Sequence, residues 1–502
     1  MGKVRPAHKK HLPRRQKIGK FSKTVTLYII LAASAVIYTA TAFKRKEFGD
    51  SQINEVLFYL LNGFTGGNAT DIAGMIYDNL ILFGIVFFII MLPVVDFYRN
   101  RIFIKFNLSF FGKNKNILFN PSKIPWRVKL IYSIAVLFGA VWFLLVSFQV
   151  PSYLRSLRES SQIFEQHYVN PKEVKLIFPK KPRNLVYIYL ESVENTLASY
   201  QAGGQKEQSL IPELERIALD KDTVSFSHSR VGLGGAHPVF GTTWTAGSMA
   251  SQSLGVPIRP DFAGIGANEY NKVNRFLPGA YGIGEVLKHQ GYNQSFVMGS
   301  DKNYGGRSKL LSQHGDYHVI DHKFAQKNKL IPDRYKVWWG YEDKKVFAFA
   351  KDEVRRLAGK DGPFNLSLLT ADTHFVDGYL DPSCPTPYKN QYDNVFACSS
   401  AQVAEFVEWL QAQPFADNTT IVLVGDHLGM QQAYYDAIIE SPNYQRTTYN
   451  AFLNSATKPK EMKPRQFASF DMYPTTLAAL GVKISGDKLG LGVNLFADNT
   501  PT

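Results

Sequence analysis

The chain has 502 residues, with 57 Lys and Arg against 42 Asp and Glu, and 45% of its residues are hydrophobic. Residues 1–150 hold 20 of the basic residues and 6 of the acidic ones, so nearly all of the formal net charge of +15 lies in this part. A nucleic-acid-binding domain usually carries its basic excess on its folded surface, whereas this excess flanks apolar segments. The charge pattern therefore excludes nucleic acid as the expected partner and favours a membrane.

Three segments within residues 1–150 are apolar and close to the length of roughly 20 residues that a helix needs to cross a bilayer. They are residues 24–43, 79–96 and 130–150. The first is too long for a signal peptide and lacks a small-residue cleavage site. The second is short and contains Pro93, so a buried core helix is its alternative. We expect residues 1–150 to form an all-α transmembrane region with three helices.

The basic residues predict how this region is oriented. Residues 1–23 contain nine Lys or Arg and no acid, and the 98–128 loop contains seven and no acid. The 44–78 loop mixes both signs. The positive-inside rule then places the N-terminal arm and the 98–128 loop in the cytoplasm. Three crossings leave everything after Val150 outside the cytoplasm.

The pattern changes after the third apolar segment. Residues 151–183 predict a linker, because a polar, helix-compatible stretch is followed by three prolines. Short apolar runs at 185–190, 364–370 and 421–425 then alternate with helical patterns such as 346–357 and 401–411. This alternation over about 300 residues predicts an α/β domain at 184–502 with a mainly parallel sheet.

Acidic and imidazole side chains follow three of the apolar runs. Glu191 follows the first, His374 lies shortly after the second, and Asp426 and His427 follow the third. In open parallel sheets the ligand site lies beyond the carboxyl ends of the strands. We expect Glu191, Asp426 and His427 to form an oxygen and nitrogen cage for one divalent cation. Each of them alone would also be an ordinary residue of a strand-to-helix loop.

Five motifs carry a resemblance to a known family. They are NLVYIYLESVENT, WTAGSMASQSLGVP, TADTHFVDGYLDPSC, VLVGDHLGM and DKLGLGVNLF, in this order between about residues 180 and 497. They resemble the motifs of the membrane phosphoglycerol transferases: the periplasmic-glucan phosphoglycerol transferase and, more distantly, lipoteichoic acid synthase. These enzymes belong to the alkaline phosphatase/sulfatase superfamily.

The resemblance implies a sulfatase-like α/β domain in a multi-pass protein of the bacterial cytoplasmic membrane, with the catalytic domain facing the periplasm or the outside. It implies transfer of a phosphoglycerol group from phosphatidylglycerol to an envelope glycan or polyol acceptor. It also implies a metal-bound threonine nucleophile, for which Thr245 is the nearest match, with Thr242 and Thr243 as neighbouring alternatives. A plain helix N-cap is the alternative role for Thr245.

With Thr245, the expected metal ligands are Glu191, Thr245, Asp426 and His427. Three oxygens and one nitrogen suit Mn²⁺ or Mg²⁺, with Zn²⁺ as an alternative. Metal coordination lowers the pKa of a threonine hydroxyl, which is otherwise a poor nucleophile at neutral pH.

The resemblance extends to several other residues. His374 resembles the histidine that contacts the transferred group, and a structural strand-end histidine is the alternative. Lys302 and Arg307 lie where the family places further substrate contacts, but the match to lipoteichoic acid synthase is loose there, and a solvated loop fits equally well. The two cysteines, Cys384 and Cys398, match a pair in the glucan-type enzymes and are expected to form a disulfide, with two free core cysteines as the alternative.

Three other functions would require different sequence features. A phosphoethanolamine transferase is the main alternative, although such enzymes usually have more membrane helices and disulfides. A sulfatase would need Cys or Ser in a C-x-P-x-R-like sequence; no Cys lies near residue 245, and Cys384-Pro385-Thr386-Pro387 lacks the arginine. An inactive envelope scaffold would be expected to lack a metal ligand, and none is missing.

Overall fold

The computed structural model describes residues 14–49, 69–95, 104–110, 113–119, 124–158, 162–258, 274–462 and 464–498. The chain divides into two compact units. The first consists of residues 1–46 and 69–152, and the second of residues 47–68 and 153–502.

The first unit contains helices with the length and composition of membrane spans. Its elements are α1 (Arg14–Phe48), α3 (Ala69–Met91), β1 (Ile104–Phe110), β2 (Lys113–Phe119) and α4 (Trp126–Ser147). Among the described residues, Ser22–Lys46 and Trp126–Ser147 are long and apolar enough to cross a bilayer, and Asn79–Met91 is a shorter apolar helix. Two such helices indicate a membrane protein, and they contain most of the predicted spans 24–43 and 130–150.

The predicted middle span, 79–96, extends past the end of its helix. α3 ends at Met91, and residues 92–94 form a turn that contains Pro93. Proline lacks the N–H that a continuing helix needs, and its ring clashes with the preceding turn. Asp96, Arg99, Arg101 and Lys123 lie outside the part of the chain that the structure describes.

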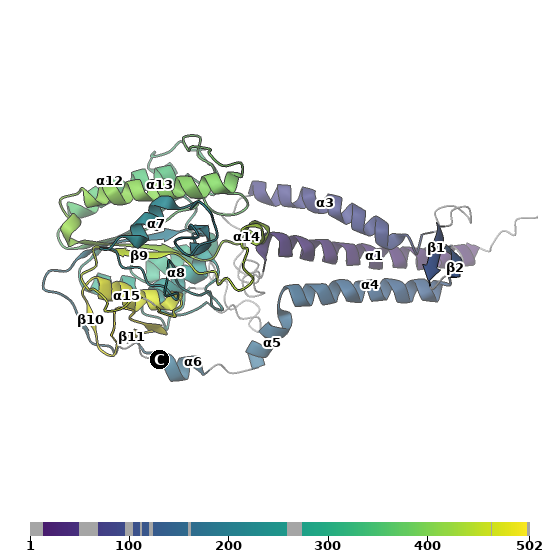
Figure 1. Cartoon of the computed structure of the whole chain (residues 1–502), viewed down its shortest axis with the longest axis horizontal. Coiled ribbons are helices and arrows are strands. Elements are labelled where there is room, and N and C mark those ends of the chain that lie inside the picture. Colours follow the sequence, from purple (N-terminus) through teal and green to yellow (C-terminus); the bar gives the residue numbers. More distant parts are fainter. Residues whose placement is uncertain are drawn as a thin grey trace, which may run out of the picture. The chain divides into compact units, whose positions relative to one another are not determined.

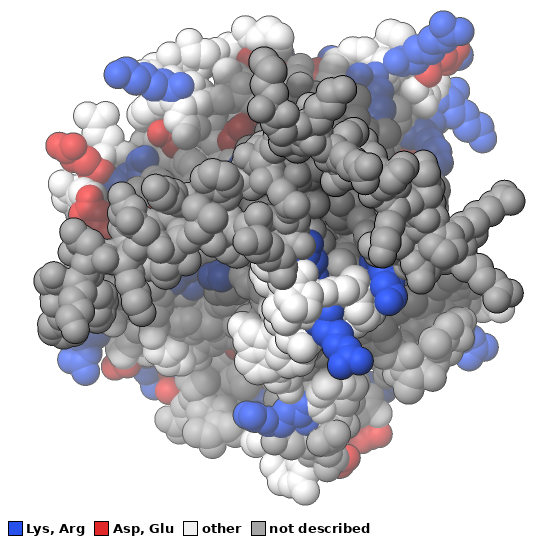
Figure 2. All heavy atoms as spheres, turned by 90° about the vertical axis from the view of Figure 1, so that its right-hand side faces the viewer, with Lys and Arg blue, Asp and Glu red and all other residues white. Residues whose placement is uncertain are grey.

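In the described part of this unit, α1, α3 and α4 alternate in direction (Figure 1). The Trp126 indole donates a hydrogen bond to Lys23 O, and Lys129 Nζ donates to Val94 O, so the start of α4 lies beside the start of α1 and the end of α3. Lys23 Nζ also lies 5.1 Å from the centroid of the Trp126 ring. Figure 2 faces this end, where blue Lys and Arg side chains border white described side chains near the centre.

The second unit is built on a six-stranded sheet with the order β6-β5-β7-β4-β8-β9. All neighbours pair in parallel except β8 and β9, which are antiparallel. The strands are β4 (Asn184–Leu190), β5 (Asn293–Met298), β6 (His318–Ile320), β7 (Phe364–Leu369), β8 (Thr419–Gly425) and β9 (Asn450–Leu453).

Helices cover both faces of this sheet (Figure 1). Val186 and Ile188 of β4 join one hydrophobic core, and Tyr187 and Tyr189 join the other. The first core is covered by α7 (Pro212–Leu219), α12 (Asp343–Ala358) and α13 (Gln391–Gln411), and the second by α8 (Thr245–Leu254), α9 (Ile283–His289) and α15 (Met472–Ala479). A parallel sheet buried on both faces explains the continuous apolar runs of its strands and confirms the predicted α/β fold with a mainly parallel sheet.

Further short elements belong to this unit, apart from the first three residues of α5, which lie in the first unit. They are α5 (Val150–Arg158), α6 (Ile163–His167), β3 (Leu176–Ile177), α10 (Arg307–Gln313), α11 (His322–Lys327), α14 (Gln432–Ile438), β10 (Lys483–Ile484), β11 (Lys488–Leu489) and β12 (Gly492–Val493). The segment expected to be a linker, 151–183, therefore contains helices and a strand. β3 pairs with β10, and Leu176 packs against the core, so the end of this segment is part of the α/β unit.

Candidate active site

The carboxyl ends of β4, β7 and β8 meet at one edge of the sheet and bring the predicted ligands together. The Glu191 N–H donates to Thr370 Oγ1 at 2.9 Å, and the Ser192 N–H donates to Asp426 Oδ1 at 2.9 Å. Gly425 makes this approach possible, because a Cβ at that position would lie 1.9 Å from Val193 O. The ends of the three strands are therefore joined by hydrogen bonds that hold the acidic residues in place.

Glu191, Asp426 and His427 form a compact, buried cluster. One ligand atom from each lies within 4.8 Å of the others. His427 Nε2 is 3.4 Å from Glu191 Oε1 and 3.4 Å from Asp426 Oδ2. The three residues are only 1–2% exposed. Two carboxylates and an imidazole at this spacing can hold one divalent cation.

Two details of the hydrogen bonding fit a metal ion. Asp426 Oδ2 is buried and has no hydrogen-bond partner among the described residues, although Oδ1 accepts from the N–H groups of Ser192 and His427. His427 Nδ1 lies 2.8 Å from Leu428 O, so a proton on Nδ1 leaves the Nε2 lone pair to the cluster. A cation would supply the partner that Asp426 Oδ2 lacks.

The electrostatics of the cluster also favour a bound cation. Burial raises the pKa of Asp426 to about 7, and the Glu191 charge contributes to this rise. Burial by itself would lower the pKa of His427. The negative charges of Asp426 and Glu191 have the larger effect, and they raise this pKa to about 10. Burial would raise the pKa of Glu191, yet the interaction with His427 lowers it to about 2. The carboxylates thus draw positive charge into the site, which a divalent cation would provide.

The Thr245 hydroxyl adjoins this cluster. It donates to Glu191 Oε2 at 3.2 Å and lies 3.4 Å from His427 Nε2. Thr245 is the first residue of α8, so the unpaired backbone N–H groups and the positive end of the helix dipole lie beside it. The hydroxyl of Thr242 instead donates to Val239 O at 3.0 Å, and that of Thr243 is buried without a partner among the described residues.

Polar side chains of α8 fix its distance from the strand ends. The Ser248 hydroxyl donates to Asp426 O, and Gln252 Nε2 donates to Ser248 Oγ at 2.8 Å. The Tyr187 hydroxyl on β4 in turn donates to Gln252 Oε1 at 2.7 Å. Thr245, Ser248 and Gln252 lie three and four positions apart in the sequence, so they share one face of α8. They couple the position of Thr245 to β4 and β8.

A pocket extends from Thr245 and Glu191 to His374. Arg307 also lines it, and its guanidinium donates to Tyr304 O and Asp301 O at 2.9 Å each. Lys302 is not among the residues that line this pocket. Of the two basic residues suggested as substrate contacts, the structure therefore brings Arg307 to the pocket and leaves Lys302 outside its lining.

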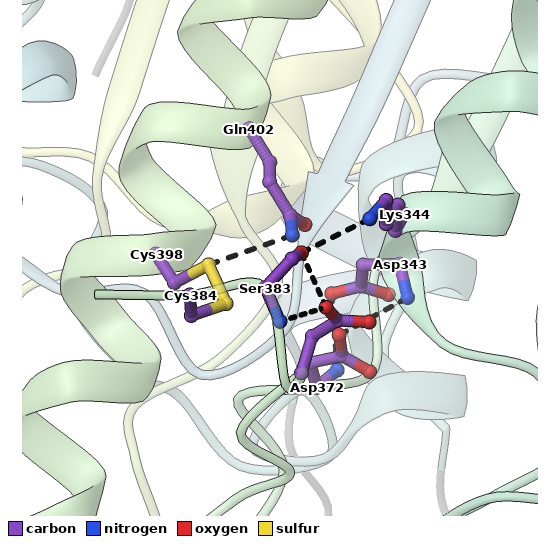
Figure 3. Close-up of a disulfide and its surroundings, with 8 residues drawn as sticks. Asp343, Lys344, Asp372, Ser383, Cys384, Cys398 and Gln402 are labelled. Carbon is purple, nitrogen blue, oxygen red and sulfur yellow. Dashed lines mark hydrogen bonds between the residues drawn. A yellow bond between two sulfur atoms is a disulfide. The ribbon is translucent and has the colours of Figure 1, made fainter. Parts of the chain in front are cut away.

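The segment that carries His374 is held by a buried carboxyl pair and by a disulfide (Figure 3). Asp343 at the start of α12 accepts from the N–H groups of Ala371 and Asp372, and Asp372 Oδ2 accepts from the Asp343 N–H at 3.1 Å. Burial raises the pKa of Asp343 to about 7 and that of Asp372 well above its usual value. Burial thus favours the neutral form of both carboxyl groups.

The disulfide joins Cys384 to Cys398 of α13, with a Cα–Cα distance of 5.7 Å. Beside it, Lys344 Nζ donates to the Ser383 hydroxyl at 3.0 Å, and Gln402 Nε2 donates to Cys398 Sγ at 3.5 Å (Figure 3). The loop after His374 is therefore tied to both α12 and α13.

Non-reducing peptide mapping of protein made through a secretory route is expected to show Cys384 linked to Cys398. Because the bond closes a loop of 14 residues, the double substitution Cys384→Ser/Cys398→Ser is expected to lower the free energy of unfolding by about 3 kcal/mol. A lower melting temperature would report it. Free, alkylatable thiols at both positions in the wild type would contradict the pairing.

Sequence reasoning missed several residues that build the site. Thr370 and Thr373 hold Glu191 through its N–H and its carbonyl oxygen, and Trp339 lines the pocket. Thr370 ends the second apolar run and Thr373 follows it, so the rule that pointed to Glu191 could have found them. Trp339 lies in a loop before α12, and only the unusual pair Trp338-Trp339 marks it in the sequence.

Curated proteins are similar to parts of this sequence. The phosphoglycerol transferase I of Xanthomonas axonopodis pv. citri is 28% identical over 388 residues, which are 73% of this chain and 51% of that protein. The protein of the same name from Escherichia coli (strain SMS-3-5 / SECEC) is 30% identical over 346 residues, 67% of this chain and 41% of that protein. This chain thus spans about half of the length of these curated relatives or less.

Solved structures are similar to parts of this chain at low sequence identity. The lipoteichoic acid synthase LtaP from Listeria monocytogenes has a TM-score of 0.46 and 17% identity, over 68% of this chain and 81% of that one. The model of the sulfatase family matches residues 183–482, which is more than half of the chain. The resemblance to phosphoglycerol transferases within this superfamily is confirmed, and the chain belongs to the sulfatase family.

Proposed function

We propose that this protein transfers a phosphoglycerol group from phosphatidylglycerol to an envelope glycan or a glycerol-phosphate acceptor, with Thr245 as the nucleophile. The observation that carries the proposal is the Thr245 hydroxyl at the start of α8, in contact with both Glu191 and His427. The name of the longer relatives, phosphoglycerol transferase I, supports the choice of transferred group.

A sulfatase reaction is disfavoured although the family bears that name. It would need Cys or Ser as the precursor of a formylglycine, and the residue in contact with the cluster is a threonine. Both cysteines of the chain are joined in the disulfide, so neither is available.

In the first step, Thr245 Oγ forms a bond to the phosphorus of the lipid, and the bond from phosphorus to the diacylglycerol oxygen breaks. Thr245 releases its proton to the solvent, and the leaving oxygen gains one from protonated His374. His374 Nδ1 lies 2.7 Å from Phe375 O, which makes Nε2 the nitrogen that exchanges the proton. The products are diacylglycerol and a phosphoglycerol ester of Thr245.

Glu191, Thr245, Asp426 and His427 would hold the metal ion, for which Mn²⁺ and Mg²⁺ are preferred and Zn²⁺ is the alternative. When bound, the ion would lower the pKa of the threonine hydroxyl and neutralise charge on the phosphoryl oxygens. The N–H groups at the start of α8 also donate to these oxygens.

In the second step, an acceptor hydroxyl attacks the same phosphorus and the bond to Thr245 Oγ breaks. His374 takes the proton of the acceptor hydroxyl, and Thr245 regains its proton from the solvent. The enzyme returns to its starting state, and a phosphodiester has replaced a phosphodiester. The two steps therefore use the same nucleophile, Thr245, and the same proton carrier, His374.

The membrane region keeps the site near its lipid donor. We propose that residues 1–150 span the bilayer three times, that 151–183 lead out of it, and that 184–502 act on the periplasmic or outer side. Anchoring the domain to the surface that contains the donor raises the effective donor concentration. The alternating directions of α1, α3 and α4 and the lysines near one end support this topology.

Fusions at residue 502 test the topology. Alkaline phosphatase fused there is expected to be active, and green fluorescent protein exported there is expected to be dark. The same reporters fused within the 98–128 loop serve as the opposite control. A fluorescent, phosphatase-negative C-terminal fusion would contradict the topology and the access to an outer-leaflet donor.

Mass spectrometry of the intact protein tests the reaction. The protein is incubated without acceptor, in vesicles that contain either phosphatidylglycerol or phosphatidylethanolamine. A mass increase of one phosphoglycerol unit is expected with the first lipid. An adduct formed only with phosphatidylethanolamine would instead identify a phosphoethanolamine transferase.

A further inference from the structure

Two adjacent tryptophans, Trp338 and Trp339, have different environments. The Trp338 indole N–H donates to Ala371 O at 3.0 Å. The Trp339 indole nitrogen is buried, and no hydrogen-bond acceptor is found for it among the described residues. A buried donor without an acceptor is destabilising, so such groups are normally paired. Within the described part of the chain, Trp339 therefore retains an unused donor.

This donor belongs to a residue of the active-site pocket. Trp339 lines the pocket together with Thr245 and His374. Its ring centroid lies 4.6 Å from that of His374 and 5.2 Å from that of Tyr304. The indole is held between a candidate proton carrier and an aromatic side chain, within the same pocket as the nucleophile.

The backbone beside Trp339 restricts its position. A Cβ at Gly340 would lie 1.9 Å from Gly299 O, so the chain packs directly against the loop after β5. The Tyr341 N–H also donates to Gly299 O at 3.1 Å. The Trp339 ring is thus supported from the backbone as well as by its aromatic neighbours.

The chemistry of the donor defines what it can bind. Once the phosphorus is next to Thr245, the rest of the head group must extend into the remaining pocket, which Tyr304, Trp339 and His374 line. An indole N–H can only donate a hydrogen bond. A glycerol hydroxyl can accept it, whereas the ammonium of ethanolamine has three donors and no acceptor.

We propose that Trp339 is a specificity-determining residue whose indole N–H donates to a hydroxyl oxygen of the glycerol head group and so favours phosphoglycerol over phosphoethanolamine. The proposal rests on the function proposed above and adds the group that distinguishes between the two head groups. A site that is built to hydrogen-bond a substrate hydroxyl discriminates against an analogue that leaves the site's polar group unpaired.

The substitution Trp339→Phe keeps an aromatic ring and removes the N–H. Full-length protein in phosphatidylglycerol or phosphatidylethanolamine vesicles is assayed for the rate of covalent adduct formation at low donor concentration. The rate with phosphatidylglycerol is expected to fall about tenfold, as for one lost hydrogen bond, while the rate with phosphatidylethanolamine stays near its wild-type level. The ratio of the two rates therefore falls about tenfold.

Trp338→Phe is the matched control, since it removes an indole N–H that is bonded to the backbone of the chain itself. It is expected to change both rates by the same factor and to leave their ratio unchanged. Both lipids are assayed on one preparation, so the ratio does not depend on the fraction of protein that is folded.

An unchanged ratio in Trp339→Phe, with a wild type that reacts with phosphatidylglycerol, would overturn the assignment of Trp339 alone. An equal fall of the ratio in Trp338→Phe would overturn it as well, because the effect would then come from the loop as a whole. A wild type that forms no phosphoglycerol adduct would remove the proposed function, and this inference with it.

Discussion

Replacing Thr245 with alanine is expected to abolish transfer while leaving the fold and much of the metal binding intact. The Thr245 hydroxyl is the group that contacts both Glu191 and His427, and no other hydroxyl in the described part of the pocket has these two contacts. Loss of a nucleophile usually lowers kcat by three orders of magnitude or more, on the order of 10³ to 10⁶. Glu191, Asp426 and His427 remain as ligands. Turnover and bound metal are measured on the same protein.

Thr245→Ser is the converse test, since it keeps the hydroxyl and is expected to retain part of the activity. Peptide mapping after incubation with phosphatidylglycerol and no acceptor should place the added phosphoglycerol on the peptide that contains Thr245. Thr242→Ala and Thr243→Ala are the matched controls and should still form the adduct. Accumulation of the adduct in Thr245→Ala would assign the nucleophile to one of these two neighbours.

The second large effect is expected at Asp426. Asp426→Ala removes a carboxylate with one buried oxygen that has no partner among the described residues, as well as the acceptor for the N–H groups of Ser192 and His427. The cluster then loses a charged ligand, and the affinity for a divalent cation should fall about a hundredfold or more. Activity should fall with it, because Thr245 is no longer activated.

Elemental analysis of the purified protein measures this loss, and titration with Mn²⁺ should restore activity only at high concentration. Asp417→Ala is a suitable control, because Asp417 is an exposed carboxylate before the opposite end of the same strand, β8. It should keep both metal and activity. Stoichiometric tight metal in Asp426→Ala would refute the assignment of the ligand.

The sequence by itself determined the elements whose local pattern follows from their burial. The strands β4, β7 and β8 are buried on both faces, so each is a continuous apolar run that can be recognised without the fold. The residues that follow them had to lie at one edge of the sheet, because parallel strands end together. This is why Glu191, Asp426 and His427 could be grouped from the sequence.

The strand β5 could not be predicted from its local sequence pattern. It begins with Asn293, Gln294 and Ser295, which do not predict a buried strand. Gln294 Nε2 donates to the carbonyl oxygens of Gly284 and Gly315, and Ser295 donates to Glu353. These partners lie up to 58 residues away in the sequence, so they come within hydrogen-bonding distance only when the chain has folded.

The tertiary structure decided which of the candidate residues meet the strand ends, and by which contacts. Thr245 lies 54 residues from Glu191, and its hydroxyl reaches Glu191 because Ser248 and Gln252 hold α8 against β8 and β4. Arg307 lines the pocket and Lys302 does not, although both belong to one polar loop. Such distinctions depend on distances of a few ångströms between distant segments. Packing and hydrogen bonding set these distances, and residue type and spacing do not encode them locally.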